Sequence, residues 1–89
     1  MLTKDITIIN RLGLHARAAA KFVGCASRFI SNIDVIKETK RVSGKSILGV
    51  MMLAASKGTV LRLEVSGDDE TDAMTTLTEL INDRFGEAE

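Results

Sequence analysis

The chain has 89 residues, 45% of them hydrophobic and 27% charged, and its 12 basic residues balance its 12 acidic ones. This size and composition predict one globular domain spanning residues 1–89 and exclude a disordered or collagen-like chain, while no apolar run approaches the roughly 18–20 residues of a membrane span. One cysteine and one histidine cannot build an internal disulfide or a structural zinc site, and without a recognisable secretory signal we expect a cytoplasmic location.

A strand followed by a helix is predicted at the start of the chain. Ile6 and Ile8 share one face of the strand, because side chains alternate between the two faces of an extended chain. A helix is predicted to begin at about Ala16. Its apolar residues recur at helical spacing: Ala19, Phe22, Val23, Ala26, Phe29 and Ile30.

A hairpin and a short helix follow. Ile33 and Val35 share one face of a second strand, which a turn near Thr39 joins to a short strand over residues 41–43. Residues 47–54 are predicted to form a short helix, because this compact apolar run begins directly after a serine suited to cap it.

One more strand and one more helix complete the pattern. Leu61, Leu63 and Val65 share a face of the strand. The last helix opens with acidic residues that complement its dipole, stops at Gly86, and repeats apolar residues at helical spacing: Ala73, Met74, Leu77, Leu80, Ile81 and Phe85. The order β-α-β-β-α-β-α, with one-sided strands, predicts an α+β fold: an open-faced sandwich with an antiparallel sheet and its helices on one face.

The charges are divided unevenly along the chain. Residues 1–63 hold eleven Lys and Arg against three Asp and Glu, whereas residues 64–89 hold one against nine. We therefore expect one positive and one negative region of the surface, the positive one able to attract phosphate, an acidic protein or nucleic acid. Nucleic acid is the weakest of these, because three phenylalanines offer no stacking platform. The alternative that the acids simply solvate the last helix stays open.

His15, the only histidine, lies where the first loop meets the first helix. The free N–H groups of a helix start form an anion site, here from the backbone of Ala16 and Arg17, and Gly13 permits a close approach. The positive helix end disfavours imidazolium and leaves a neutral nucleophile, while the Arg17 guanidinium suits phosphate oxygens. These residues predict a phosphoryl-accepting histidine, with a solvated loop histidine as the alternative. A His15–Cys25 catalytic pair is disfavoured, because roughly three helical turns separate them.

Two segments resemble signatures of one protein family. Residues 12–23, Leu-Gly-Leu-His-Ala-Arg-Ala-Ala-Ala-Lys-Phe-Val, resemble the active-site segment of the HPr family, the histidine phosphocarriers of the bacterial phosphoenolpyruvate-dependent phosphotransferase system. Residues 44–53, Gly-Lys-Ser-Ile-Leu-Gly-Val-Met-Met-Leu, resemble the regulatory-serine segment of that family, at a matching spacing from His15. The resemblance covers essentially the whole chain. It implies an HPr-like open-faced β-sandwich of four antiparallel strands and three helices.

The resemblance also implies a chemistry and a set of partners. It implies that enzyme I phosphorylates His15 on Nδ1 with a group taken from phosphoenolpyruvate, and that His15 passes the group to an IIA-type protein. Arg17 matches the arginine that stabilises the phosphate. The residues that match the docking surface for both partners are Ala16, Ala20, Ile47, Leu48 and Met51. We accordingly expect a monomeric carrier without a cofactor, and not an enzyme.

Ser46 has two interpretations that stay open. As a helix cap it contributes about 1 kcal/mol by accepting a hydrogen bond from the first turn. In the family context it resembles the target of HPr kinase/phosphorylase, whose phosphate would change the docking surface. That surface is expected to be apolar and exposed, because a short helix that is apolar on both faces cannot bury both against one sheet.

Some residues depart from the common family pattern. Many members have asparagine and proline where this chain has Leu12 and Ala18. Its Arg-Leu-Gly-Leu-His segment and its Phe-Gly-Glu ending resemble the proteobacterial nitrogen-related branch, or the HPr of organisms with an incomplete phosphotransferase system. Sugar transport, nitrogen metabolism and gene regulation therefore all stay open as the final output. The competing hypothesis is a regulatory interaction module that binds kinase or transcription partners through helix 47–54.

Overall fold

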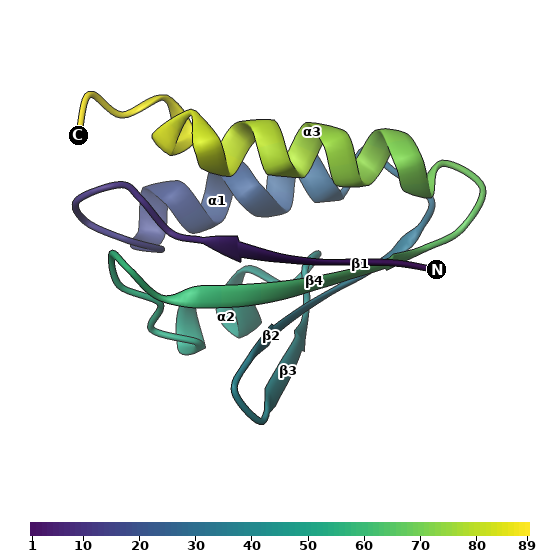
Figure 1. The fold of residues 1–89 in the computed structure, drawn as a ribbon, viewed down its shortest axis with the longest axis horizontal. Coiled ribbons are helices and arrows are strands. Elements are labelled where there is room, and N and C mark those ends of the chain that lie inside the picture. Colours follow the sequence, from purple (N-terminus) through teal and green to yellow (C-terminus); the bar gives the residue numbers. More distant parts are fainter.

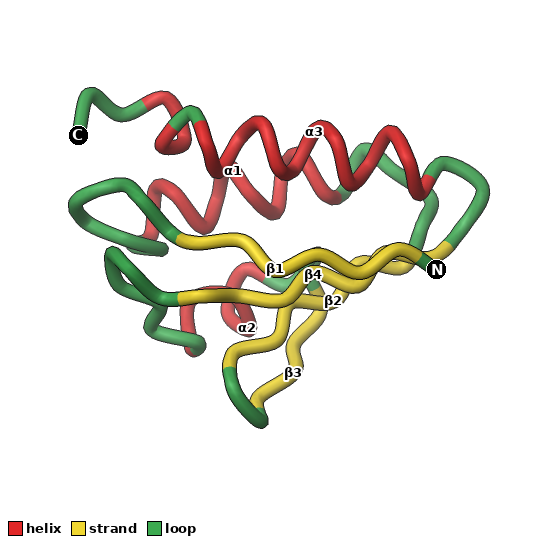
Figure 2. The backbone as a smooth tube through the Cα atoms, viewed as in Figure 1, coloured by secondary structure: helices red, strands yellow, loops and turns green.

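The computed structural model describes all 89 residues and contains the predicted elements in the predicted order. The strands are β1 (Leu2–Thr7), β2 (Asn32–Lys37), β3 (Lys40–Ser43) and β4 (Val60–Ser66). The helices are α1 (Ala16–Ala26), α2 (Ile47–Met52) and α3 (Glu70–Asn82), followed by a short 3-10 turn over Arg84–Gly86. One antiparallel sheet has the strand order β1-β4-β2-β3, and α1 and α3 run side by side along it (Figure 1, Figure 2). The predicted α+β open-faced sandwich is confirmed.

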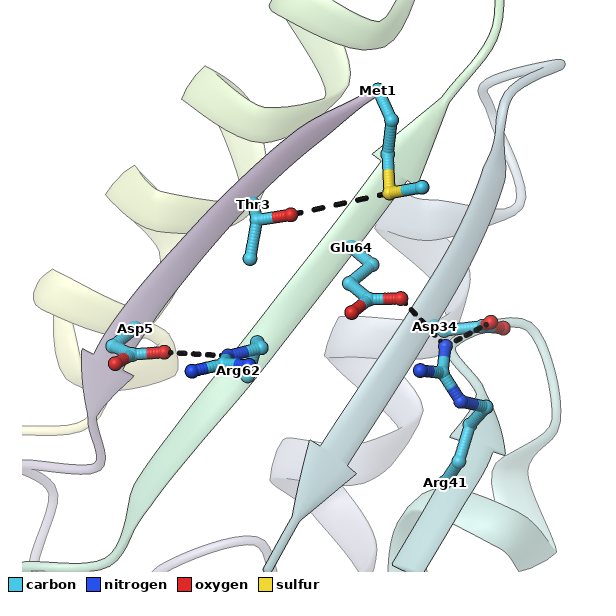
Figure 3. A network of polar contacts seen from close by, with 7 residues as sticks. All are labelled: Met1, Thr3, Asp5, Asp34, Arg41, Arg62 and Glu64. Atoms are coloured by element: carbon cyan, nitrogen blue, oxygen red, sulfur yellow. Dashed lines mark hydrogen bonds and ion pairs between the residues drawn. The ribbon is translucent and has the colours of Figure 1, made fainter.

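The sheet separates an apolar face from a charged face. Its inner face buries six side chains: Ile6, Ile33, Val35, Leu61, Leu63 and Val65. On its outer face Arg62 donates to Asp5, its direct partner across β1 and β4, at 3.1 Å (Figure 3). Arg41 donates to Asp34 at 2.9 Å and to Glu64 at 2.6 Å, two carboxylates that face each other across β2 and β4. The hydrogen bond from Arg41 holds the pKa of the Glu64 carboxyl below its usual value, so the guanidinium relieves a like-charge pair.

The helices supply the other half of the core. Apolar residues of α1 and α3 pack on the sheet: Ala18, Ala19, Phe22 and Ala26 from α1, and Ala73, Met74, Leu77 and Ile81 from α3. α2 packs against α1 and β3 and buries Val50. None of the three helices combines the length and the apolar character that a bilayer span requires.

Helices α1 and α2 both end earlier than the sequence predicts. α1 ends at Ala26, so Phe29 and Ile30 lie in the following loop, where Phe29 is half-buried and Ile30 is 74% exposed. α2 ends at Met52 rather than at residue 54, because Ala54 has a left-handed φ of +51° that no α-helix can contain. Ala54 is exposed.

Asp69 explains why the chain leaves α1 before Ile30. Its carboxylate accepts the backbone N–H of Ile30 at 2.9 Å and that of Ser31 at 3.0 Å, and it also accepts the Ser31 hydroxyl. Gly67 allows this close approach, since a Cβ there would lie 2.6 Å from the Ser31 hydroxyl oxygen. The Ser31 hydroxyl and the Ile30 N–H hold the pKa of the Asp69 carboxyl below its usual value. Asp69 therefore joins the loop after α1 to the loop before α3.

We predict that Asp69→Asn lowers the denaturant midpoint at neutral pH, because an amide cannot accept all three donors as a carboxylate does. The folded-state pKa of Asp69 is lowered, so its contribution is full above the ordinary value of 3.8 and is lost as the pH falls through the folded-state value. The difference between variant and wild type should therefore shrink at about pH 3. Asp68→Asn, at an exposed neighbour without a hydrogen bond, is the control and should match wild type at both pH values. A constant difference across pH would contradict this account.

Candidate functional site

The loop before α1 is fixed against the segment after α2. The backbone N–H of Leu14 donates to the Ala55 carbonyl at 2.8 Å, and the Leu14 side chain is buried. Gly13 makes this contact possible, because its φ is +68° and a Cβ there would lie 2.4 Å from the Ala55 oxygen. The position of His15, which follows directly, is therefore set by long-range packing.

His15 is the N-cap of α1, with extended backbone angles and no capping hydrogen bond from its side chain. The backbone N–H groups of Ala16, Arg17 and Ala18 have no acceptor within the chain. Arg17 is exposed and forms no ion pair. The structure thus brings together, at one helix start, the open N–H groups and the guanidinium that the sequence predicts around His15.

The C-terminal tail returns to the same helix start. A Glu87 carboxylate oxygen is hydrogen-bonded to the His15 Nε2, and the two side chains are 14% and 25% exposed. The other Glu87 oxygen accepts the Asn10 side-chain amide at 3.0 Å, and the same amide nitrogen donates to the Gly13 carbonyl at 2.8 Å. The Asn10 and His15 hydrogen bonds hold the pKa of the Glu87 carboxyl below its usual value, so it stays ionised near neutral pH. The His15 Nδ1 has no hydrogen-bond partner in the chain.

Asn10 and Glu87 were not among the residues that the sequence singled out. Asn10 is fully buried, and its burial, which would have marked it as part of a hydrogen-bonded network, cannot be seen in the sequence. Glu87 lies 72 residues from His15 along the chain, so no local pattern connects them.

A left-handed turn after α3 places Glu87 beside His15. α3 ends at Asn82, so Phe85 is not on that helix as its spacing predicts, although it is fully buried. Arg84, Phe85 and Gly86 have φ values of +55°, +53° and +79°, which reverses the chain after α3. The Lys21 ammonium donates to the Phe85 carbonyl at 2.6 Å and holds the turn against α1. Gly86 is therefore part of a turn that follows the helix end.

Two acidic residues of the C-terminal tail lie against the N-terminal part of the chain. Glu87 lies against His15, and Glu89 pairs with Arg11 at 3.1 Å while its main-chain oxygen accepts the Arg11 N–H at 2.9 Å. These two carboxylates of the acidic segment are therefore placed beside residues of the segment that is rich in Lys and Arg.

An apolar surface lies on α2, next to α1. Four of its side chains are exposed, namely Ile47 by 43%, Leu48 by 70%, Met51 by 38% and Met52 by 73%. We call these four residues the α2 patch. Ala16 and Ala20 are also exposed, and α1 packs against α2, so the five predicted docking residues come from two contacting helices. The Ser46 hydroxyl accepts the Gly49 N–H at 3.2 Å, which confirms Ser46 as the N-cap of α2.

Cys25 lies on a different part of α1. Burial raises the pKa of its thiol, and no hydrogen bond joins it to His15. The cysteine has no place in the site around His15. The structure also contains no group of three or more His, Cys, Asp or Glu side chains placed to hold a metal ion.

Comparisons with known proteins agree with this fold over the whole chain. Residues 2–83 match the family described as the PTS HPr component phosphorylation site. The chain is 60% identical to phosphocarrier protein HPr of Neisseria meningitidis and 57% identical to that of Pseudomonas putida, with 100% of each chain covered. HPr-C-His from Thermoanaerobacter tengcongensis has a TM-score of 0.96 at 48% identity, again with 100% of both chains covered. HPr from Bacillus anthracis has a TM-score of 0.87 at 35% identity, covering 90% of this chain and 95% of that one.

The fold and these relatives together define a phosphocarrier of the phosphotransferase system. The chain belongs to the HPr family, so it carries a phosphoryl group within that system, acts with its other components, and is not a catalytic enzyme. The resemblance drawn from the sequence is confirmed.

We predict that Gly13→Ala destabilises the protein, because the left-handed backbone alone costs about 1–3 kcal/mol for a residue with a side chain. The clash with Ala55 should also displace the loop that carries His15. Gly24→Ala is the matched control, since a Cβ there meets nothing within 4 Å. That variant should be more stable than wild type by about 0.5–1 kcal/mol, because alanine replaces glycine inside a helix. Chemical denaturation measures both, and equal stabilities would refute the assignment of strain to Gly13.

Proposed function

We propose that His15 accepts the phosphoryl group on Nδ1 from phosphorylated enzyme I and passes it to an IIA-type protein in the cytoplasm. The observation that carries this proposal is the unpaired Nδ1 of a histidine whose Nε2 is already hydrogen-bonded. An imidazole nitrogen that attacks phosphorus must keep its lone pair free, and of the two ring nitrogens only Nδ1 has no hydrogen-bond partner within the chain.

The open helix start supplies the charge stabilisation. The incoming group brings negative charge to a point where the N–H groups of Ala16 and Arg17 lack acceptors. The Arg17 guanidinium can turn to the phosphoryl oxygens without breaking an existing ion pair. We assign Arg17 to phosphate stabilisation on these grounds.

We propose that enzyme I and the IIA-type protein dock on Ala16 and Ala20 together with Ile47, Leu48 and Met51. Exposed apolar side chains on two contacting helices favour a protein partner, and methionine adapts to more than one surface. The contact should be small, because a carrier has to release each partner. The single domain of residues 1–89 presents both His15 and the α2 patch, so we propose that it acts as a monomer.

Ser46 is proposed as a regulatory site for an HPr kinase/phosphorylase. It opens α2 directly beside the α2 patch and is exposed, so a phosphate there would add about −1.5 to −2 charge at the edge of the docking surface. The phosphate would lie at a helix start, where negative charge is tolerated, so the helix should persist. Its effect should fall on partner binding.

The acceptor assignment is tested by intact mass after incubation with enzyme I, magnesium and phosphoenolpyruvate. Wild type and the control Gly24→Ala should each gain one acid-labile phosphoryl group. His15→Ala should gain none while keeping its denaturation midpoint. A phosphorylated His15→Ala protein would remove His15 from the mechanism. No gain by wild type, with an enzyme I that phosphorylates another HPr, would favour the regulatory interaction module.

The regulatory assignment is tested by replacing Ser46 with two residues that both cap helices well. Ser46→Asp adds a negative charge and should slow phosphorylation by enzyme I on the order of tenfold, with a larger effect at low salt. Ser46→Asn keeps the cap without the charge and should react like wild type. Initial rates of phosphoryl acceptance give the comparison, and equal rates for the two variants would exclude an electrostatic switch at this position.

A further inference from the structure

The two carboxylate oxygens of Glu87 are hydrogen-bonded to two different side chains. One oxygen accepts the Asn10 amide at 3.0 Å and the other is bonded to the His15 Nε2. The Asn10 amide cannot turn over, because its nitrogen also donates to the Gly13 carbonyl at 2.8 Å. A reversed amide would set its oxygen against two other oxygens. The Asn10 side-chain amide therefore donates a hydrogen bond, and the Glu87 oxygen that faces it accepts that bond.

The position of Glu87 is fixed by packing around the tail. Phe85 is fully buried, the Lys21 ammonium binds its carbonyl at 2.6 Å, and the Glu87 N–H donates to the Arg84 carbonyl at 2.9 Å. Beyond Glu87, the Glu89 carbonyl accepts the Arg11 N–H. The carboxylate is thus held on both sides.

An ionised carboxylate has only acceptor atoms, so the ring nitrogen that faces it must carry the proton. Neutral imidazole has one protonated nitrogen, which places the lone pair of His15 on Nδ1. We propose that Glu87 is a positioning residue that holds His15 in the Nε2–H tautomer and so presents Nδ1 as the nucleophile. This inference rests on the proposed function.

The same contact also bears on the transfer step. As the Nδ1 lone pair forms the bond to phosphorus, the bond between phosphorus and the donor group breaks and its electron pair leaves with the donor. Positive charge develops on the imidazole ring, and Nε2 keeps its proton against the Glu87 carboxylate. The carboxylate therefore stabilises the ring charge in the transition state. When the phosphoryl group is passed on, the bond between Nδ1 and phosphorus breaks, its electron pair returns to Nδ1, and the ring becomes neutral again.

Glu87→Gln separates this role from simple tethering, because glutamine has nearly the same shape but only one acceptor oxygen. Asn10 requires that oxygen, so the glutamine NH₂ is directed at the His15 Nε2. The ring then has to move its proton to Nδ1, which blocks the nucleophile. The control is Glu89→Gln, which removes one negative charge from the same tail. It keeps the hydrogen bond between the Arg11 N–H and the main chain of residue 89, and it does not alter the hydrogen bond between Glu87 and His15.

The experiment is NMR of the His15 ring nitrogens at about pH 8.5, together with the rate of phosphoryl acceptance. Wild type and Glu89→Gln should show protonated Nε2 and unprotonated Nδ1, and should react alike. Glu87→Gln should show a shift of the proton to Nδ1 and a rate lower by about tenfold or more, as for other carboxylates that fix a catalytic histidine.

An unchanged tautomer in Glu87→Gln would overturn the positioning role, as would a changed tautomer with an unchanged rate. If wild type accepts no phosphoryl group at all, the proposed function fails, while the tautomer comparison still decides whether Glu87 orients the ring. The two failures are therefore distinguishable.

Discussion

The backbone hydrogen bond from Leu14 to Ala55 is the constraint on which the site depends. It joins the loop before α1 to the segment after α2, at a distance that only a glycine at position 13 allows. The contact fixes where α1 begins, and therefore where its unpaired N–H groups point. It also sets α2 beside that helix start. The proposed nucleophile and the proposed docking surface, which come from distant parts of the sequence, are thus carried by two helices in contact.

The site combines strong local fields with an open surface. The positive end of α1 is suited to the phosphoryl group proposed for His15, while the Glu87 carboxylate lies beside the same histidine and opposes excess negative charge. A carrier has to hold its cargo weakly enough to release it. At His15, which is partly exposed, the positive helix end and the negative Glu87 carboxylate offset each other. This arrangement serves that purpose better than an enclosed pocket, where a phosphoryl group would be bound firmly and hidden from the next acceptor.

The sequence predicts the strands, the helix starts, the capping role of Ser46 and the exposed apolar residues of α2, because each follows from local periodicity or local hydrogen bonding. It predicts the ends of α1 and α2 poorly. The carboxylate of Asp69 binds the loop that follows α1, and its partners there are 38 and 39 residues away in the sequence. Phe85 keeps its predicted burial but reaches it through a left-handed turn. Glu87 and Asn10 were missed, since their meeting depends on three segments whose packing no local pattern encodes.

The strand order has a consequence for the way the chain folds. β4 lies at the centre of the sheet, between β1 and β2, and Leu2 pairs with Val65. Only the β2–β3 hairpin joins strands that are close in sequence. Two of the three strand pairings therefore have to close long loops, and the first strand has no partner until residues 60–66 have been synthesised. During synthesis on the ribosome, the β1 segment therefore stays without a strand partner until β4 has emerged.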